Sequence, residues 1–245
     1  MKPARCKDAT LPSFHFGYEQ TADLQPTLTQ YARMFDLGEI GGTLGYPLFM
    51  KPYDGGGWVG VSKIDDEAQL RAAYESSGTK VMHLQAAVIP YDFFVRCIGL
   101  GPQTRAVNYD PSAPLHDRYR MDRGFVTPDA QAELEDITLT INAFFGWDFN
   151  SCEALQKSGR WHPIDFANAC PDSQVTSLHY HFPWLIKANL RSAIYCAATR
   201  RAVHRNLDWE PFFEIAAEDL PDREKLRRYA LLARQHFDAE AFEEF

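Results

Sequence analysis

Lys51 and a run of glycines are the first residues whose types and spacing suggest chemistry. An apolar segment, residues 46–51, ends in the lysine, and Gly55, Gly56 and Gly57 follow within a few residues. Glycine lets backbone N–H groups approach phosphate oxygens without an intervening side chain, and an ammonium four residues earlier can reach the same phosphates. The pattern predicts a phosphate-binding loop between two strands. A tight hairpin with a surface lysine is the alternative that these residues leave open.

The context of this loop excludes two better-known nucleotide motifs. Gly55, Gly57 and Gly60 match the spacing of a dinucleotide fingerprint, but residues 61–64 read as a strand where that motif needs a helix. No Gly-Lys-Ser/Thr closes the segment, so it is not a Walker loop. The loop is similar to the phosphate-covering loop of protein kinases, yet the chain lacks their His-Arg-Asp and Asp-Phe-Gly signatures.

Three oxygen-bearing side chains form the second candidate group. Glu153 lies on one predicted strand, and Asp165 and Asn168 lie on or just after the next, beyond a glycine-containing turn. Neighbouring antiparallel strands would bring these oxygens together, and carboxylate and amide oxygens suit Mg²⁺. The sequence therefore predicts a magnesium site, with ordinary surface placement of the three residues as the alternative.

The elements that must position these residues follow from apolar patterning and from turn and cap signals. Strands come first and helices later, which indicates an α+β fold rather than a parallel α/β sheet. We expect a long connection over residues 101–124. The predicted strands span residues 46–51, 59–64, 81–88, 93–100, 147–155 and 162–166, and the predicted helices 30–37 (broken by Gly41, Gly42 and Gly45), 65–76, 128–145, 184–201 and 222–237.

Composition narrows the class of protein. The 245 residues carry a net charge of −8, whereas proteins that wrap nucleic acid usually present a basic field. Five scattered cysteines indicate a reducing compartment rather than a disulfide framework. The chain shows neither a signal peptide nor a membrane-spanning run, so we expect a cytoplasmic protein that binds neither nucleic acid nor membrane.

Taken in order, these segments resemble the ATP-grasp superfamily over residues 46–172. Residues 46–61 look like its small-lobe strand, lysine and flexible glycine loop, so the resemblance implies that Lys51, Gly55, Gly56 and Gly57 bind ATP phosphates. Residues 81–88 look like the hinge strand that holds adenine, which implies contacts from Gln85 and Val88. Asp92 falls where the family has an acid for the ribose hydroxyls. Glu153, Asp165 and Asn168 resemble its metal ligands.

The resemblance implies an ATP-grasp fold with an ATP cleft between two α+β lobes and a helical C-terminal region. Residues 1–45 would be a lead-in or the remnant of a larger domain, residues 46–92 the small lobe and residues 93–245 the large lobe. ATP with Mg²⁺ would activate a carboxylate as an acylphosphate for attack by an amine. Arg96 and Arg105 would meet phosphate or substrate carboxylate, although exposed strand arginines are an equal alternative.

The chain departs from the family pattern in two ways. Asp165 replaces the usual glutamate and stands three positions before Asn168 rather than two, and only 50 residues precede Lys51, too few for the usual N-terminal substrate domain. A nucleotide-binding remnant without turnover and an ATP-grasp-type kinase therefore remain alternative functions. A second copy or a partner subunit could complete the site.

Overall fold

The computed structural model describes residues 8–11, 36–54, 58–78, 80–122, 124–168, 171–202 and 207–245. The chain divides into two compact units, Met1–Ile89 and Pro90–Phe245, and each is described by itself. The predicted division at residues 45 and 92 stays a prediction.

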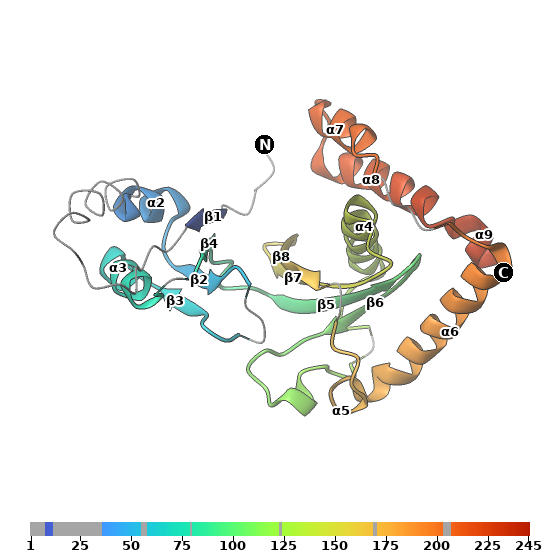
Figure 1. Ribbon diagram of the computed structural model, residues 1–245, viewed down its shortest axis with the longest axis horizontal. Coiled ribbons are helices and arrows are strands. Elements are labelled where there is room, and N and C mark those ends of the chain that lie inside the picture. The colour runs from blue at the N-terminus through green and yellow to red at the C-terminus, as the bar shows by residue number, and fades with distance from the viewer. Residues whose placement is uncertain are drawn as a thin grey trace, which may run out of the picture. The chain divides into compact units, whose positions relative to one another are not determined.

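The first unit is a small antiparallel sheet with helices packed on one face. Its strand order is β1-β4-β2-β3, with β1 at Asp8–Leu11, β2 at Leu48–Pro52, β3 at Ser62–Ile64 and β4 at Met82–Ala86 (Figure 1). Helices α2 (Leu37–Leu44) and α3 (Glu67–Ser76) contribute to the same apolar core as the strands. That core contains Leu37, Leu44, Leu48, Met50, Ile64, Leu70, Met82 and Leu84.

Side chains alternate along β2, and this alternation separates the core from the chemistry. Leu48 and Met50 point into the core, so Phe49 and Lys51 point to the opposite face. The register pairs Phe49 with Gln85 of β4. The opposite face, which we call the face without helices because neither of the helices described in this unit packs on it, therefore carries Lys51 and Gln85.

Helix α2 corrects one prediction. We expected a helix over residues 30–37 that glycines break, but the observed helix begins at Leu37 and contains Gly41 and Gly42. The side chain of Asp36 caps it by accepting the N–H of Glu39. Residues 30–35 lie outside the described part of the chain.

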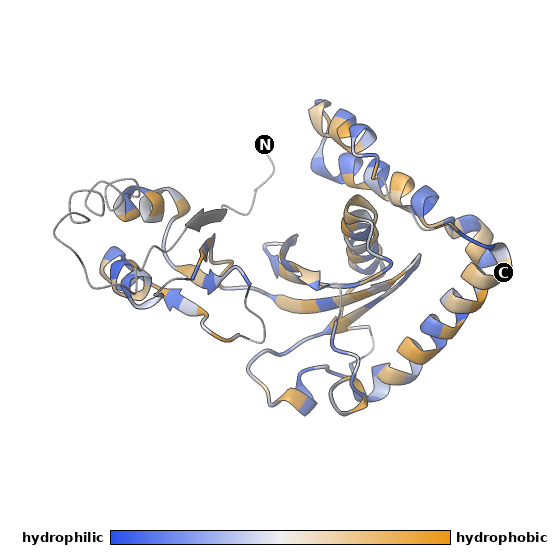
Figure 2. Ribbon diagram, viewed as in Figure 1, coloured by the Kyte–Doolittle hydropathy of each residue, from blue (hydrophilic) through white to orange (hydrophobic). Residues whose placement is uncertain are grey.

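The second unit is built on a four-stranded antiparallel sheet of order β6-β5-β7-β8. These strands are β5 (Phe93–Leu100), β6 (Gln103–Asn108), β7 (Phe149–Lys157) and β8 (Arg160–Asn168). Figure 2 shows β5, which lies between β6 and β7, as a mainly apolar strand. Helix α4 (Pro128–Phe145) lies across one face of the sheet, with its N-terminus capped by Thr127 (Figure 1).

The two faces of this second sheet differ in character. Val95, Cys97, Ala154 and Trp161 point toward α4 and form a core with Leu134 of that helix. By alternation, Arg96 and Glu153 belong to the opposite face, which we call the open face because α4 does not cover it. The predicted polar residues of this unit thus lie on the face away from α4.

Strand β6 lies inside the region that we expected to be a connection. Its sequence, Gln-Thr-Arg-Ala-Val-Asn, contains a single buried residue, Val107. A strand at the margin of a sheet pairs on one side only and can remain largely polar, so apolar patterning does not reveal it. The expectation that residues 101–124 form a long connection is wrong for residues 103–108, which form β6.

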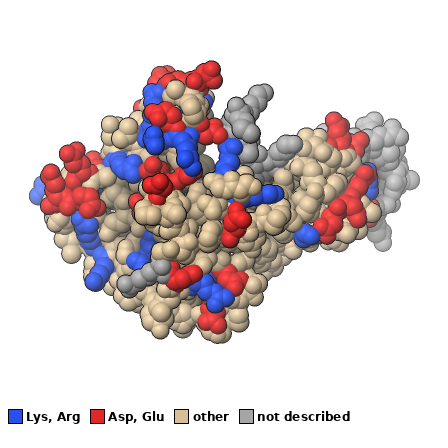
Figure 3. Space-filling view, turned by 180° about the vertical axis from the view of Figure 1, so that it is seen from behind, with Lys and Arg blue, Asp and Glu red and all other residues tan. Residues whose placement is uncertain are grey.

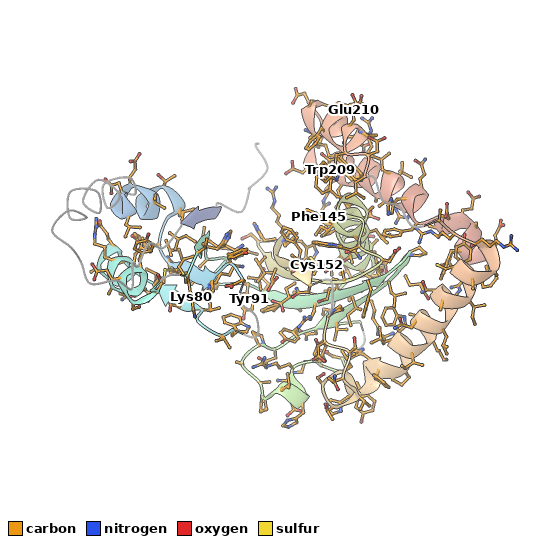
Figure 4. All side chains as sticks on the ribbon, in the orientation of Figure 1. Lys80, Tyr91, Phe145, Cys152, Trp209 and Glu210 are labelled. Atoms are coloured by element: carbon orange, nitrogen blue, oxygen red, sulfur yellow. The ribbon has the colours of Figure 1, made fainter. Side chains whose placement is uncertain are left out.

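The C-terminal third is helical, as predicted. It contains α5 (Val175–Leu178), α6 (Phe182–Thr199), α7 (Glu210–Ala217), α8 (Asp222–His236) and α9 (Ala239–Glu244). Helix α8 packs on α4 through a cluster that includes Leu139, Ala143, Ala233 and Phe237. Trp209, labelled in Figure 4, stacks on Phe144 at 5.6 Å and ties the start of α7 to the end of α4.

Charge and hydropathy at the surface are mixed. On the face drawn in Figure 3, basic and acidic side chains lie beside one another rather than in separate fields. Within the described residues, no helix is both long enough and apolar enough to cross a membrane.

Candidate functional site

The three predicted metal ligands come together on the open face of the second sheet. Glu153 of β7 stands directly opposite Asp165 of β8 in the strand register. The Asn168 side-chain amide donates to a carboxylate oxygen of Asp165 at 3.3 Å and to the Ser151 carbonyl at 3.2 Å. The amide oxygen of Asn168 is therefore the atom left to act as an acceptor or ligand, in the orientation that these bonds define.

A β-bulge explains how residues three positions apart share a face. In a regular strand Asp165 and Asn168 would point to opposite faces, because side chains alternate with a period of two. Here Ser151 pairs with Asn168 and Glu153 with Asp165, so three steps along β8 match two along β7. The extra residue is absorbed by the register shift, and both side chains reach the same face. The unusual spacing in the sequence is thus compensated in the structure.

Arg96 lies against this acidic group on the neighbouring strand. Its guanidinium is 3.5 Å from a Glu153 oxygen and donates to the Ser151 hydroxyl at 3.1 Å from Nη2 and 3.2 Å from Nε. Its Cζ atom also lies 5.6 Å and 5.8 Å from the ring centres of Tyr109 and Tyr119. Burial disfavours the cation, but Tyr119 and Glu153 outweigh burial and raise the pKa of Arg96.

Arg105, on β6, reaches the same face and takes a different partner. Its Nε donates to Nδ1 of His181 at 3.1 Å, while Nε2 of His181 lies 2.9 Å from the Arg120 carbonyl. Because Nδ1 accepts, the proton of the neutral ring must sit on Nε2, which donates to that carbonyl. Burial lowers the pKa of His181, in keeping with a neutral imidazole beside a guanidinium. Arg105 is thus a positioned cation rather than a loose surface arginine.

In the first unit, Lys51 and Gln85 contact each other. The Lys51 ammonium donates to the Gln85 side-chain oxygen at 3.2 Å on the face without helices. Val88 follows the end of β4 and is half-buried. A strand, loop and antiparallel strand stand where we predicted them, since β2 pairs with β3. Gly55, Gly56 and Gly57, which the sequence places between these two strands, lie outside the described residues.

Asp92 lies in the second unit. Its carboxylate accepts the backbone N–H of Ser158 at 3.2 Å, at the turn that joins β7 to β8. The predicted ribose contact stays a prediction.

Two buried cysteines of this unit, Cys97 and Cys152, do not add a nucleophile. Cys97 and Cys152 face each other across β5 and β7, on the side of α4, and both are buried (Cys152 is labelled in Figure 4). Burial raises the pKa of Cys97 to about 12, and it raises the pKa of Cys152 as well. Thiols in this state stay protonated and serve as core residues. Cys170, which follows Asn168 closely, lies outside the described residues.

The donor set fits a hard divalent cation. Two carboxylates and one amide oxygen match the ligand chemistry of Mg²⁺, which keeps further positions for water and phosphate. Among the described residues, no group of three or more His, Cys, Asp or Glu side chains could hold a metal. A site here depends on Asn168 to complete the set, and it disfavours a softer metal such as zinc.

Several residues of this surface were not predicted. The sequence did not indicate that Ser151, Tyr109 and Tyr119 surround Arg96. The strand register places Ser151 and Tyr109 beside it, and the bridge between Tyr109 and Tyr119 adds the second ring. His181 belongs to a His-Tyr-His segment, residues 179–181, that carries no local signal for a partner. Its pairing with Arg105 could not be seen without β6.

Comparison with known proteins identifies the fold. No protein-family model matches the chain, and a search of curated proteins finds no match. A search of the solved structures shows that the chain has the ATP-grasp fold. It resembles a D-alanine–D-alanine ligase from Bacillus anthracis with a TM-score of 0.54 and 14% identity, over 80% of this chain and 64% of that one.

A second structure of the Bacillus anthracis ligase, complexed with ATP, gives a TM-score of 0.53 and 12% identity over 80% of this chain and 62% of that one. The chain thus spans less than two thirds of the length of these proteins. The shared feature is the fold, and the prediction of an α+β ATP-grasp architecture is confirmed.

Proposed function

We propose that this protein is an ATP- and magnesium-dependent ligase that activates a carboxylate as an acylphosphate for attack by an amine. The observation that carries the proposal is the meeting of Glu153, Asp165 and Asn168 on one face of the second sheet, across a bulge that offsets their unusual spacing. The ATP-grasp fold supports it at the level of class.

The proposal assigns the phosphates of ATP to the first unit's cation and loop. Lys51 would contact the α- and β-phosphates, and the backbone of Gly55, Gly56 and Gly57 would cover them. The contact between Lys51 and Gln85 supports this role, because it fixes the ammonium on a strand and leaves two of its N–H donors for a ligand. Gln85 and Val88 would adjoin the adenine, and Asp92 the ribose.

Glu153, Asp165 and Asn168 would hold Mg²⁺, which when bound neutralises charge that develops on the transferring phosphoryl group. In the reaction, a carboxylate oxygen attacks the γ-phosphorus and ADP leaves. An amine nitrogen then attacks the acyl carbon, phosphate leaves, and the nitrogen loses a proton.

Arg96 and Arg105 would bind anionic groups of the substrate. Arg96 is already paired with Glu153, which favours a role in orienting that carboxylate as much as direct contact with phosphate. Arg105 keeps its charge beside a neutral His181, an arrangement suited to a substrate carboxylate or phosphate.

The first test is nucleotide-dependent stability. Millimolar ATP with Mg²⁺ should raise the melting temperature of the wild-type protein, and Lys51→Ala should abolish the shift, because binding to the native state stabilises it. Lys63→Ala is the matched control, since Lys63 is an exposed lysine of the same unit that pairs with Asp65. A wild-type protein whose melting temperature ignores the nucleotide would argue against the proposal.

A second experiment separates a ligase from the alternatives. Release of ADP with a panel of carboxylic acids and amines, together with formation of an amide, is the expected outcome. Nucleotide binding without ADP release would identify a remnant without turnover, and a phosphoester product would identify a kinase.

A further inference from the structure

One side of β6 is open to pairing with another strand. The Tyr109 N–H donates to the Phe94 carbonyl. Because bonded and non-bonded residues alternate along an antiparallel pair, Gln103, Arg105 and Val107 also exchange backbone hydrogen bonds with β5. The backbone groups of the residues between them, Thr104, Ala106 and Asn108, therefore point away from the sheet. This orientation is verified at Asn108, whose carbonyl accepts the N–H of Arg120.

A short piece of the chain begins a fifth strand on this edge and then leaves it. Tyr119 forms an antiparallel bridge with Tyr109, flanked by bonds from Asp110 N–H to the Arg118 carbonyl and from Arg120 N–H to the Asn108 carbonyl. Beyond that point the paired segment diverges. Within the described residues, the outward N–H and C=O groups of Thr104 and Ala106 make no hydrogen bond.

A hollow of about 640 Å³ lies where the strand would continue. Residues 104–107 of β6 form one wall of it. Arg120, Asp122 and Phe125 also line it. Unpaired strand backbone beside a cavity is the arrangement that receives an extended peptide by strand addition.

We propose that β6 binds an extended peptide, about three residues of which pair with Thr104–Ala106. The inference goes beyond the proposed ligase activity, because this binding requires no nucleotide. Residues of the peptide opposite Thr104 and Ala106 exchange backbone bonds with them and point toward the α4 side, where Phe125 packs against the core. The residue between them stands opposite Arg105 and points to the open face.

The chemistry of the two sides defines the peptide sequence that fits. The ionised lining residues are Arg105, Arg120 and Asp122, and Asp122 is engaged by the Asn108 amide at 2.7 Å. Arg120 is paired with Asp110 at 2.6 Å, whereas Arg105 donates to a neutral imidazole, so it is the charge of Arg105 that favours a carboxylate on the central residue of the peptide, in a cross-strand pair. Apolar side chains on either side suit Phe125. The ligand class is thus an apolar–acidic–apolar extended segment.

The test uses a fluorescein-labelled, C-terminally amidated pentapeptide, Thr-Val-Glu-Val-Thr, and the wild-type full chain without nucleotide. Fluorescence anisotropy should show saturable binding. N-methylation of both valine amides should weaken binding about tenfold or more, because it removes the two donors that pair with β6. Equal binding of the methylated peptide would overturn the proposal, as would a wild-type protein that does not bind the parent peptide.

Protein variants supply matched controls. Ala106→Pro removes an outward N–H without breaking the ladder to β5, since proline is tolerated on edge strands, and it should weaken binding as N-methylation does. Thr104→Val changes a side chain on the same edge but keeps every N–H, so it should bind like the wild type. Arg105→Gln should remove the preference for glutamate over glutamine in the peptide. If Ala106→Pro does not fold, the methylated peptide on wild-type protein decides the question.

Amide hydrogen exchange tests the edge directly. Thr104 and Ala106 should exchange quickly in the free protein and slowly with the parent peptide. Slow exchange of both amides in the free protein would mean that another segment of the chain already covers the edge, and it would overturn the proposal. Since no nucleotide is present, a failure here is distinct from a failure of ATP binding at Lys51.

Discussion

At the residue scale, the central feature is a buried ion pair inside an aromatic surround. The side chains of Arg96 and Glu153 are only 13% and 11% exposed, and Tyr109 and Tyr119 flank the guanidinium. Burial raises the pKa of Tyr119, so the phenol is neutral and the aromatic ring is its contribution to the cluster. Removing one charge of such a pair leaves the other buried and uncompensated.

Arg96→Met should therefore destabilise the second unit by about 3 kcal/mol in chemical denaturation. The double variant Arg96→Met/Glu153→Gln should recover part of that loss, because the unpaired carboxylate is gone. Lys63→Met, which breaks the exposed pair with Asp65, should cost less than about 1 kcal/mol. Equal losses for the buried and the exposed variant would contradict this account of the pair.

His181 predicts a dependence of stability on pH. Its pKa is lowered from the ordinary value of 6.5, so the unfolded state binds a proton that the native state does not as pH falls below 6.5. The contribution of His181 to the free energy of unfolding is complete above about pH 6.5, and it is lost on acidification through the lower pKa of the native state. His162 shifts in the same direction, so the comparison must isolate His181.

His181→Gln provides that comparison, because glutamine can accept from Arg105 and donate to the Arg120 carbonyl without titrating. The free energy of unfolding of the wild type should fall relative to this variant between pH 8 and pH 5.5. A difference between the two proteins that is the same at both pH values would show that His181 does not titrate on unfolding.

At the element scale, α2 offers a sharp contrast between adjacent glycines. A Cβ atom at Gly41 would lie 2.1 Å from the Tyr46 hydroxyl oxygen, whereas nothing lies within 4 Å of a Cβ at Gly42. Gly41→Ala should destabilise the first unit by about 1–3 kcal/mol, since the half-buried Tyr46 ring must shift. Gly42→Ala should stabilise it by about 0.5–1 kcal/mol through helix propensity.

Thermal unfolding of the two variants checks this prediction, with each serving as the control for the other. Destabilisation by both substitutions would mean that the helix does not run through residues 41 and 42. Destabilisation by neither would remove the packing of Tyr46 against Gly41.

Elements with strong local signals could be predicted from the sequence. The helix Pro128–Phe145 and the strand Phe93–Leu100 appear at the predicted bounds, because proline and threonine mark the helix start and an apolar run, interrupted by Arg96, marks the strand. Strand β6 and helix α2 could not be predicted. A polar edge strand lacks periodicity, and glycine in a helix becomes favourable only when a neighbouring ring occupies the space of its side chain.

The candidate site likewise contains contacts that the sequence predicts and contacts that it does not. Because the sequence indicates two adjacent strands here, it predicts that Glu153 and Asp165 lie close together, and the structure brings them opposite each other. The sequence also predicted that Asn168 would join them, but in a regular strand its spacing from Asp165 would place the two side chains on opposite faces, and only the register shift shows how they share one. The pairing of Arg105 with His181 joins residues 76 positions apart and has no local signal.

At the scale of the whole molecule, each unit carries one half of the proposed nucleotide chemistry. The first unit presents Lys51 and Gln85 on the face without helices, and the second presents the acidic group on the open face. The chain spans 64% of the Bacillus anthracis ligase, so its substrates remain proposals.

The measurement that tests the central claim most directly is paramagnetic relaxation by Mn²⁺ in place of Mg²⁺. In a protein labelled with ¹⁵N-asparagine, adding Mn²⁺ with ATP should broaden the side-chain amide signals of Asn168 and leave those of Asn189, on α6, sharp. The loss at Asn168 should disappear in Asp165→Ala. Sharp Asn168 signals in a sample whose raised melting temperature shows that the nucleotide is bound would contradict a metal site formed by Glu153, Asp165 and Asn168.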